Sequence, residues 1–300
     1  MESRQEHILL VDGMALLFRS FFATAVSGQF MVNLQGLPTN GVQGFMKHLF
    51  MAAEHADPTH IIICWDMGSK TFRNEVYQDY KSNRNAPPVE LIPQFDLAKE
   101  VAGRFNLSNV GVSGYEADDC IGTLAKEYKG ERKVSVVSGD QDLLQLLDEG
   151  IEIMLLQKGF GNYKTYTKNG FVEEKGITPE QFIDVKALMG DTSDGYPGVK
   201  GIGEKTAMKL IQEHGDIEGI LQNLSSLTPS QKKKIEADLD MLHLSRKLAE
   251  IHCQVPLDVK LSECVWNQVS SEHLDVVEEM ELKVLRRYLL GSNVMLPVSG

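Results

Sequence analysis

The sequence predicts an α/β protein with a mainly parallel, twisted sheet, followed by a helical region. Short apolar runs that are rich in Ile and Val alternate with helix-like stretches over the first two-thirds of the chain. Runs of this kind are typical of strands that are buried on both faces of a parallel sheet. From about residue 179 only helix-like stretches follow, so we expect an α/β domain over roughly 1–195 and a helical remainder.

Three of the predicted strands end in an acidic residue. These are the runs at 7–12, 60–66 and 133–140, and further strands are expected at 106–112 and 152–156. The stretches between them have the composition and periodicity of helices. The predicted helices lie at about 14–23, 41–56, 91–105, 116–129 and 141–147.

The C-terminal third carries clear helix boundaries. Thr178 as an N-cap and Pro179 in the first turn predict a helix over 179–189. A Gly-rich turn then leads into a helix that stops at Gly215. Residues 228–252 are predicted to form one long helix, and the remainder two short helices and a loose tail.

Composition excludes several classes of protein. The 300 residues carry 42 acids and 30 bases, a net charge of −12, which argues against a simple basic nucleic-acid binder. A hydrophobic content of 42% excludes wholesale disorder. No apolar run approaches the ~20 residues of a membrane span, and the polar N-terminus has no signal-peptide core. Four cysteines without C-x-x-C spacing argue against a disulfide framework or a zinc ribbon, so we expect a cytoplasmic protein.

Carboxylates gather where the predicted strands end. The carboxyl ends of parallel strands meet at one edge of the sheet, where binding sites form. Asp191 and Asp194, three residues apart, would share one face of a helical turn. Any one of these acids alone can be explained as a helix cap or a turn residue. The nine candidates, from five segments, are Asp12, Asp66, Glu116, Asp118, Asp119, Asp140, Asp142, Asp191 and Asp194.

Nine carboxylates at one edge require a counter-charge. Without cations they would repel one another and raise each other's pKa values. Hard divalent cations with oxygen ligands, Mg²⁺ or Mn²⁺, resolve that repulsion, and the absence of Cys and His from these segments argues against zinc. Two metals ~4 Å apart can clamp the attacking and leaving oxygens of a phosphoryl displacement. We therefore predict phosphodiester hydrolysis by a metal-activated water, with no protein nucleophile.

A Gly-rich turn at 197–207 precedes a helix. Its glycines permit positive φ and a close backbone approach, and the helix N-terminus can bind phosphate without reading sequence. The alternative is a tight interhelical turn with surface lysines. A Walker A loop does not match, because Glu204 comes before the lysine and no strand precedes the turn. The residues concerned are Gly198, Gly201 and Gly203, with Lys200, Lys205 and Lys209.

Residues 71–84 interleave basic and aromatic side chains directly after the second acid-ended strand. Cationic groups beside stackable rings suit single-stranded DNA or a frayed end. The alternative is an amphipathic helix whose rings pack inward, and Glu75 and Asp79 dilute the positive charge. The side chains concerned are Arg73, Lys81 and Arg84, with Phe72, Tyr77 and Tyr80.

Five of these segments occur in a distinctive order: ILLVDG, FR…YKSNR, YEADDCIGTLA, SGDQDLLQL and GDTSDGYPGVKGIGEKTA. Together they resemble the bacterial 5′–3′ exonuclease (flap endonuclease) family, which includes the N-terminal nuclease domain of DNA polymerase I. The resemblance spans roughly 7–290, and no polymerase region follows, so we expect a stand-alone member. Gly195 and Tyr196 stand where the family more often has Asn and an aliphatic residue, which affects loop detail and not the ligands.

The resemblance implies a division of the chain. A PIN-like (resolvase-like) nuclease domain would cover 1–178, with a helical arch at about 70–100 through which a 5′ single strand threads. A helical module with a helix–three-turn–helix would cover 179–290, followed by a tail at 291–300.

The resemblance also implies roles for individual residues. One metal site would use Asp12, Asp66, Glu116, Asp118 and Asp140, and the second Asp119, Asp142, Asp191 and Asp194. Lys81 and Arg84 would be catalytic, contacting the scissile phosphate and stabilising its developing charge. Tyr77 would stack on a base, and K⁺ would bind the carbonyls of the Gly-rich turn. The full set implied to bind DNA is Arg73, Tyr77, Tyr80, Gly198, Lys200, Gly201, Gly203 and Lys205.

The activity implied is that of a structure-specific 5′ nuclease acting as exonuclease and flap endonuclease. It would use two Mg²⁺ ions, with Mn²⁺ able to substitute, and leave 5′-phosphate and 3′-OH ends. Its substrate would be DNA with a 5′ flap, nick or overhang, including RNA-primed ends. The protein would be a monomer that acts at the nucleoid in primer removal and repair. A PIN-type ribonuclease and a non-catalytic branched-DNA binding protein are the alternatives. The first usually lacks the Gly-rich module, and the second does not need the acids.

The predicted site also accounts for the acidic balance. Residues 1–195 hold 27 acids and 18 bases, and nine of the acids belong to the cluster. The other 18 acids balance the 18 bases. The negative charge that argued against a nucleic-acid partner is therefore largely the predicted metal site itself.

Overall fold

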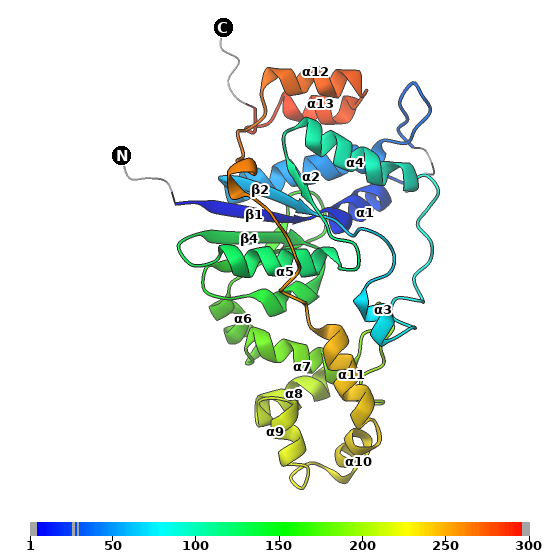
Figure 1. Ribbon diagram of the computed structural model, residues 1–300, viewed down its shortest axis with the longest axis vertical. Coiled ribbons are helices and arrows are strands. Elements are labelled where there is room, and N and C mark those ends of the chain that lie inside the picture. Colours follow the sequence, from blue (N-terminus) through cyan, green and yellow to red (C-terminus); the bar gives the residue numbers. More distant parts are fainter. Residues whose placement is uncertain (1–4, 26–27, 29, 296–300) are drawn as a thin grey trace.

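A six-stranded sheet lies between two layers of helices, and a helical module extends from one of those layers (Figure 1). The computed structural model describes residues 5–25, 28 and 30–295. The last five residues of the predicted tail therefore lie outside the described residues. No helix in the described part of the chain is long and apolar enough to cross a membrane.

The sheet confirms the predicted mainly parallel α/β architecture. Its strand order is β3-β2-β1-β4-β5-β6, and every neighbouring pair is parallel except β5 and β6. The antiparallel edge strand β6 was not predicted. The strands are β1 (His7–Asp12), β2 (His60–Cys64), β3 (Ser108–Val110), β4 (Lys133–Ser138), β5 (Ile151–Leu156) and β6 (Tyr163–Tyr166).

Alternate residues of the central strands face two separate cores. Leu9 and Val11 of β1 belong to one core, and Ile8 and Leu10 belong to the other. Burial on both faces explains why these strands read as continuous apolar runs. The first core is covered by α1 (Gly13–Thr24), α2 (Asn40–Ala56), α4 (Ile92–Arg104), α12 (Ser271–Glu279) and α13 (Lys283–Leu289), and the second by α5 (Ala117–Tyr128), the 3₁₀ helix η1 (Gln141–Leu146) and the helical module.

The helical module differs from the prediction: the helices at 168–175 and 217–222 were not predicted, and one predicted helix is divided. The single long helix expected over 228–252 is wrong, because the chain leaves helical geometry at Asp238, with φ −116° and ψ 23°. After α11 the chain crosses in front of α5 on its way to α12 (Figure 1). The helices of this part are α6 (Lys168–Lys175), α7 (Pro179–Met189), α8 (Glu204–His214), α9 (Ile217–Gln222), α10 (Pro229–Ala237) and α11 (Leu239–Ala249).

The segment expected to form an arch contains α3 (Phe72–Val76) and the start of α4. Turns and irregular backbone at 77–91 join the two helices. The turns rest on the loop after α7, where Lys81 N donates to the Asp194 carbonyl at 2.7 Å and Asn83 Nδ2 to the Thr192 carbonyl at 2.6 Å. This packing brings residues 77–84 next to the last two acids of the predicted cluster.

Candidate active site

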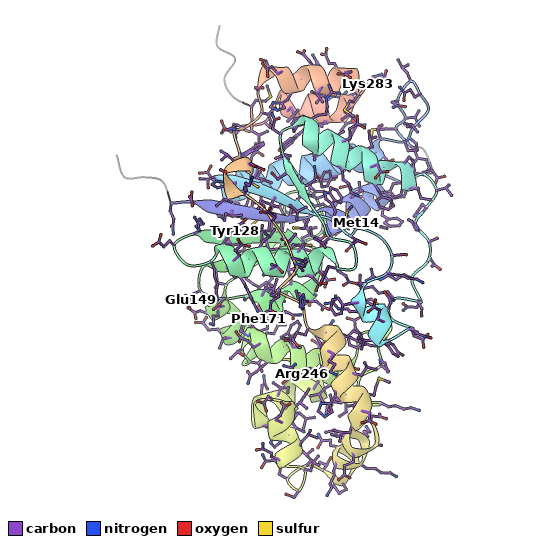
Figure 2. All side chains as sticks on the ribbon, viewed as in Figure 1. Met14, Tyr128, Glu149, Phe171, Arg246 and Lys283 are labelled. Atoms are coloured by element: carbon purple, nitrogen blue, oxygen red, sulfur yellow. The ribbon has the colours of Figure 1, made fainter. Side chains whose placement is uncertain are left out.

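Most of the predicted carboxylates surround one cavity at the carboxyl ends of the strands. Asp12 ends β1, and Asp66 and Asp140 follow β2 and β4. Met14 borders this cavity, and Figure 2 shows it at the opposite end of the strands from Glu149. The cavity has a volume of about 450 Å³ and is lined by Asp12, Met14, Ala15, Phe18, Asp66, Lys81, Arg84, Glu116, Ala117, Asp118, Gly139 and Asp140.

Asp12 is held at the base of the cavity. It caps α1 by accepting a hydrogen bond from Ala15 N at 2.9 Å, and its other oxygen accepts one from Ser138 Oγ at 2.5 Å. Burial raises the pKa of Asp12 to about 6, although these hydrogen bonds lower it, and the charges of Asp66 and Asp140 add to the rise. Among the described residues, Asp12 forms no ion pair with a lysine or arginine, although Lys81 and Arg84 line the same cavity.

Asp118 lies in a similar environment. Its carboxylate has no hydrogen-bond partner among the described residues. Burial and the charges of Asp140 and Asp12 raise the pKa of Asp118 well above its ordinary value. Carboxylates that disfavour their own ionised form in this way are ready to accept a cation.

Glu116 and two cations of the segment 77–84 meet at the wall of the cavity. Lys81 Nζ forms an ion pair with Glu116 Oε1 at 2.7 Å and lies 3.8 Å from Asp194 Oδ2. Arg84 Nη2 pairs with Asp194 Oδ1 at 2.8 Å. The structure thus brings both residues predicted to be catalytic to the carboxylates, and places them between the strand-end acids and the loop after α7.

The second group of acids is joined by a lysine that was not predicted. Lys186 Nζ lies 2.7 Å from Asp142 Oδ1 and also pairs with Asp191. Burial raises the pKa of Asp142 to about 7, and the charge of Asp140 adds to this rise. Burial also acts to raise the pKa of Asp191, but Lys186 and Ser193 outweigh it and lower that pKa to about 2. In the structure, Lys186 lies within the run 183–188, which is buried throughout.

Asp119 does not share the environment of the other acids. Its side chain is fully buried and forms a two-pronged ion pair with Arg73, each contact 2.8 Å long. Its oxygens also accept from Glu116 N at 3.0 Å and His252 N at 2.8 Å. Since both oxygens are already occupied by the protein, the structure does not support the predicted role of Asp119 as a metal ligand.

Three side chains that were predicted to contact DNA pack against the protein instead. Arg73 is 2% exposed, and its remaining N–H groups donate to the carbonyls of Leu248 and Glu250. Tyr80 is also buried and donates its hydroxyl to Asp194 at 3.0 Å, while Tyr77 is half-buried against the same small core. The inward-packing alternative is thus the better description of these three side chains.

The Gly-rich turn is tightly constrained and only partly exposed, because Gly198 is buried whereas Gly201 and Gly203 are exposed. Gly198 and Gly201 have φ values of 62° and 80°, which favour glycine. A Cβ on Gly198 would lie 2.3 Å from Gly190 N, so the turn is packed against the end of α7. Gly203 caps α8, and Lys200 and Lys205 are exposed beside it. The turn is therefore a tight interhelical connection that carries two exposed lysines.

The donor set fits hard divalent cations. All the side chains concerned are carboxylates, with no thiol or imidazole among them, as Mg²⁺ and Mn²⁺ prefer. Within the described residues, no three His, Cys, Asp or Glu side chains converge as they stand to hold a metal ion. Instead Lys81, Arg84 and Lys186 lie between the carboxylates. Burial, with an added contribution from the neighbouring acids, still raises the pKa values of Asp12 and Asp118 in the presence of these cations.

Two family models match the chain in succession. The N-terminal resolvase-like domain of 5′–3′ exonucleases matches residues 7–176, and the 5′–3′ exonuclease C-terminal SAM fold matches residues 177–272. A 5′–3′ exonuclease of Bacillus subtilis (strain 168) is 58% identical over 282 residues, 94% of this chain and 95% of that protein. DNA polymerase I of Streptococcus pneumoniae serotype 4 is 38% identical over 288 residues, 95% of this chain but only 33% of that protein.

Solved structures with the same fold are more distant in sequence. The T5 D15 protein co-crystallized with metal ions has a TM-score of 0.66 and 22% identity, covering 95% of this chain and 98% of that one. The catalytic core of Rad2 in complex with a DNA substrate has a TM-score of 0.57 and 16% identity, covering 94% of this chain and 88% of that one. These likenesses confirm the resolvase-like fold with its helical C-terminal module.

Proposed function

Because the chain belongs to the 5′–3′ exonuclease and flap endonuclease family, we propose that its carboxylate cavity is the site of DNA hydrolysis at junctions between a 5′ single strand and a duplex. The observation that carries this proposal is the convergence of acids from the ends of three strands with two cations of the segment after α3. This combination suits a phosphodiester, which needs both metal-binding oxygens and positive groups for its own charge.

Eight of the nine predicted acids would hold the metals. Mg²⁺, with Mn²⁺ able to substitute, would supply water activation and charge neutralisation when bound. The strand-end group would hold one ion, and the group around Lys186 the other. The first comprises Asp12, Asp66, Glu116, Asp118 and Asp140, and the second Asp142, Asp191 and Asp194, without Asp119.

Lys81 and Arg84 would act on the substrate phosphate. Their present partners, Glu116 and Asp194, would pair with divalent cations in the loaded site, which leaves both basic groups free to turn to the phosphate. Donors aimed at the scissile phosphate stabilise the charge that develops on it in the transition state. The leaving oxygen would remain on the 3′ end, so the products carry 5′-phosphate and 3′-OH groups.

The helical module would hold the duplex. The N-terminus of α8 after Gly203, with the exposed Lys200 and Lys205, suits a phosphate backbone, and carbonyls of the turn at 198–203 would bind K⁺. This division corresponds to a nuclease domain at 1–178 and a DNA-holding module at 179–290. The substrates would be 5′ flaps, nicks and overhangs, including RNA-primed ends. The protein would act on them as a monomer, during primer removal and repair at the nucleoid.

The test is a cleavage assay on a 5′-flap duplex with Mg²⁺ and with EDTA. We expect metal-dependent product with a 5′-phosphate, and none in EDTA. Asp118→Asn should lose most of the activity, whereas Asp275→Asn, an exposed acid on α12, serves as the matched control. Tight binding of the flap duplex without metal-dependent product would overturn the proposed function.

A further inference from the structure

A cluster of three rings lies on the other side of α3 from the carboxylate cavity. The rings of Tyr115 and His252 are stacked, with centroids 5.5 Å apart and an angle of 24° between their planes. The Phe72 ring lies 5.8 Å from each of them, nearly edge-on to His252. All three side chains are partly exposed, and they come from three distant segments of the chain.

The buried carboxylate of Asp119 fixes this cluster in place. Arg73, which pairs with Asp119, follows Phe72, and its guanidinium lies 4.7 Å from the Phe72 ring centroid. The amide of Glu116, which follows Tyr115, donates to one Asp119 oxygen, and His252 N donates to the other. Asp119 therefore binds the residue that follows Phe72, the residue that follows Tyr115, and the backbone of His252 itself. These bonds hold the three rings in position without a ligand.

Two cavities flank the rings. One, of about 660 Å³, is lined by residues 70–72, 74, 75, 78, 114 and 115. The other, of about 380 Å³, is lined by Phe72, Lys126 and residues 247 and 250–254. The two cavities meet at Phe72, so a flat group could enter on either side of the ring cluster.

The charges around the rings are mainly positive. Lys70, Lys126 and Lys247 are exposed and have no carboxylate partner within the described residues. Of the two acids that line the cavities, Glu250 pairs with Arg246, and only Glu75 is left against the three lysines. Partly exposed rings beside unpaired cations are the features with which proteins hold the bases and phosphates of single strands.

We propose that the Phe72–Tyr115–His252 cluster is a second nucleic-acid site, which stacks a base of single-stranded DNA outside the carboxylate cavity. The helix α3 is the wall between the two sites: Arg73 points to the acids, and Phe72, Asn74 and Glu75 line the outer cavity. The proposal rests on the proposed function for the identity of the strand. It assigns to Asp119 and Arg73 the role of positioning residues for this surface.

The test is the affinity for a fluorescein-labelled single-stranded oligonucleotide, measured by anisotropy in EDTA so that no cleavage occurs. Tyr115→Leu and His252→Ala should each weaken binding about tenfold, the order of magnitude lost with one base–aromatic stack. Tyr288→Leu on α13 is the matched control, since Tyr288 is also a partly exposed ring close to a lysine. Circular dichroism would verify that the variants are folded.

A second measurement locates the bound strand. An oligonucleotide carrying 5-iododeoxyuridine should crosslink to peptides that contain Tyr115 or His252. Unchanged affinity in both variants, an equal loss in the Tyr288→Leu control, or crosslinks only to other peptides would overturn the proposal. Because binding is measured without metal, failure of this site is distinguishable from failure of the proposed nuclease activity, which would appear as absent Mg²⁺-dependent cleavage.

Discussion

Asp118 and Asp119 are neighbours in the chain with opposite surroundings. Successive residues of a helix point about 100° apart, so at the start of α5 one carboxylate faces the cavity and the other faces the protein interior. Asp119 accepts hydrogen bonds from three residues, whereas Asp118 has no hydrogen-bond partner within the described part of the chain. The two acids should therefore respond oppositely to removal of their charge.

Asp118→Asn should stabilise the metal-free protein. The raised pKa of Asp118 means that the folded state resists its ionisation, so the parent loses stability as the pH rises above about 4 and through that raised pKa. The melting temperature of Asp118→Asn in EDTA should match the parent near pH 4 and exceed it by a few degrees at pH 8. Differential scanning calorimetry across this range checks the sign.

Excess Mg²⁺ should reverse the order of the two proteins, because only the parent keeps the full set of ligands. Asp275→Asn provides the control for a change of net charge alone. If Asp118→Asn melts below the parent in EDTA at every pH, burial of Asp118 beside the other strand-end acids does not disfavour its charge.

Asp119→Ala should be strongly destabilising. It leaves the buried guanidinium of Arg73 without its partner, and such a loss costs about 3–5 kcal/mol. Urea unfolding in EDTA measures the change directly. An unfolding free energy close to the parent's, together with a need for more Mg²⁺ in cleavage, would instead show that Asp119 is a metal ligand.

Asp191→Ala should slow cleavage while leaving DNA binding nearly intact. Asp191 contacts Lys186 and the backbone of its own loop, whereas the lysines predicted to hold the duplex, Lys200 and Lys205, are exposed on the Gly-rich turn. Mutation of a residue that hydrogen-bonds to a metal ligand typically lowers activity by about 10–100-fold. Loss of the ligand itself should therefore lower it by at least about a hundredfold. Single-turnover cleavage and anisotropy on the same flap duplex separate the two effects. Cleavage at the parental rate would remove Asp191 from the second metal group.

At the scale of elements, the strands were predictable because their signal is local. The runs at 8–11 and 61–64 are buried on both faces, so their apolar character is continuous. The edge strand β6 has only four residues, and of these only Tyr166 is buried, which leaves no pattern to read. The break between α10 and α11 has a tertiary cause: Asp238 Oδ2 accepts from Lys200 N at 2.8 Å, a contact that the helical pattern of 229–249 does not reveal.

The candidate site shows the same division between local and tertiary information. Asp12 and Asp66 could be predicted because strand ends carry them to one edge of the sheet. The environment of Asp119 could not be predicted, because it depends on contacts with Arg73 and His252, which are 46 and 133 residues away in the chain. Lys186 was missed because a lysine in a helix is ordinarily a surface residue.

The Gly-rich turn gives a prediction at this scale. Gly198→Ala should impair both duplex binding and cleavage, because its Cβ would clash with the backbone of Gly190, next to Asp191. Lys200→Ala should weaken duplex binding alone and lower its salt dependence by up to about one phosphate contact. Salt titrations of duplex affinity, with cleavage rates measured in parallel, distinguish the two. An unchanged salt slope in Lys200→Ala would remove that lysine from the phosphate contacts.

At the scale of the whole molecule, the net charge of −12 bears directly on DNA binding. Outside the nine predicted cluster acids, residues 1–195 are neutral, with 18 acids and 18 bases. Asp119 is neutralised internally by Arg73, and Glu116, Asp142, Asp191 and Asp194 pair with a lysine or arginine. Among the described residues, Asp12, Asp66, Asp118 and Asp140 are the cluster acids without an ion pair, and these would repel a phosphate backbone. Two divalent cations would add four positive charges at that edge of the sheet, and the molecule should therefore bind DNA through its metals as much as through its basic residues.

The affinity for a flap duplex should accordingly depend on the metal. With a non-hydrolysable linkage at the junction, binding in Mg²⁺ should be at least about tenfold tighter than in EDTA, which corresponds to about 1.4 kcal/mol. The double variant Asp118→Asn/Asp140→Asn removes two repelling charges, so it should bind more tightly than the parent in EDTA and gain less from Mg²⁺. Equal affinity of the parent in Mg²⁺ and EDTA would show that the carboxylate cavity does not meet the DNA backbone, because the carboxylates that line this cavity must repel any phosphate placed there in the absence of metal.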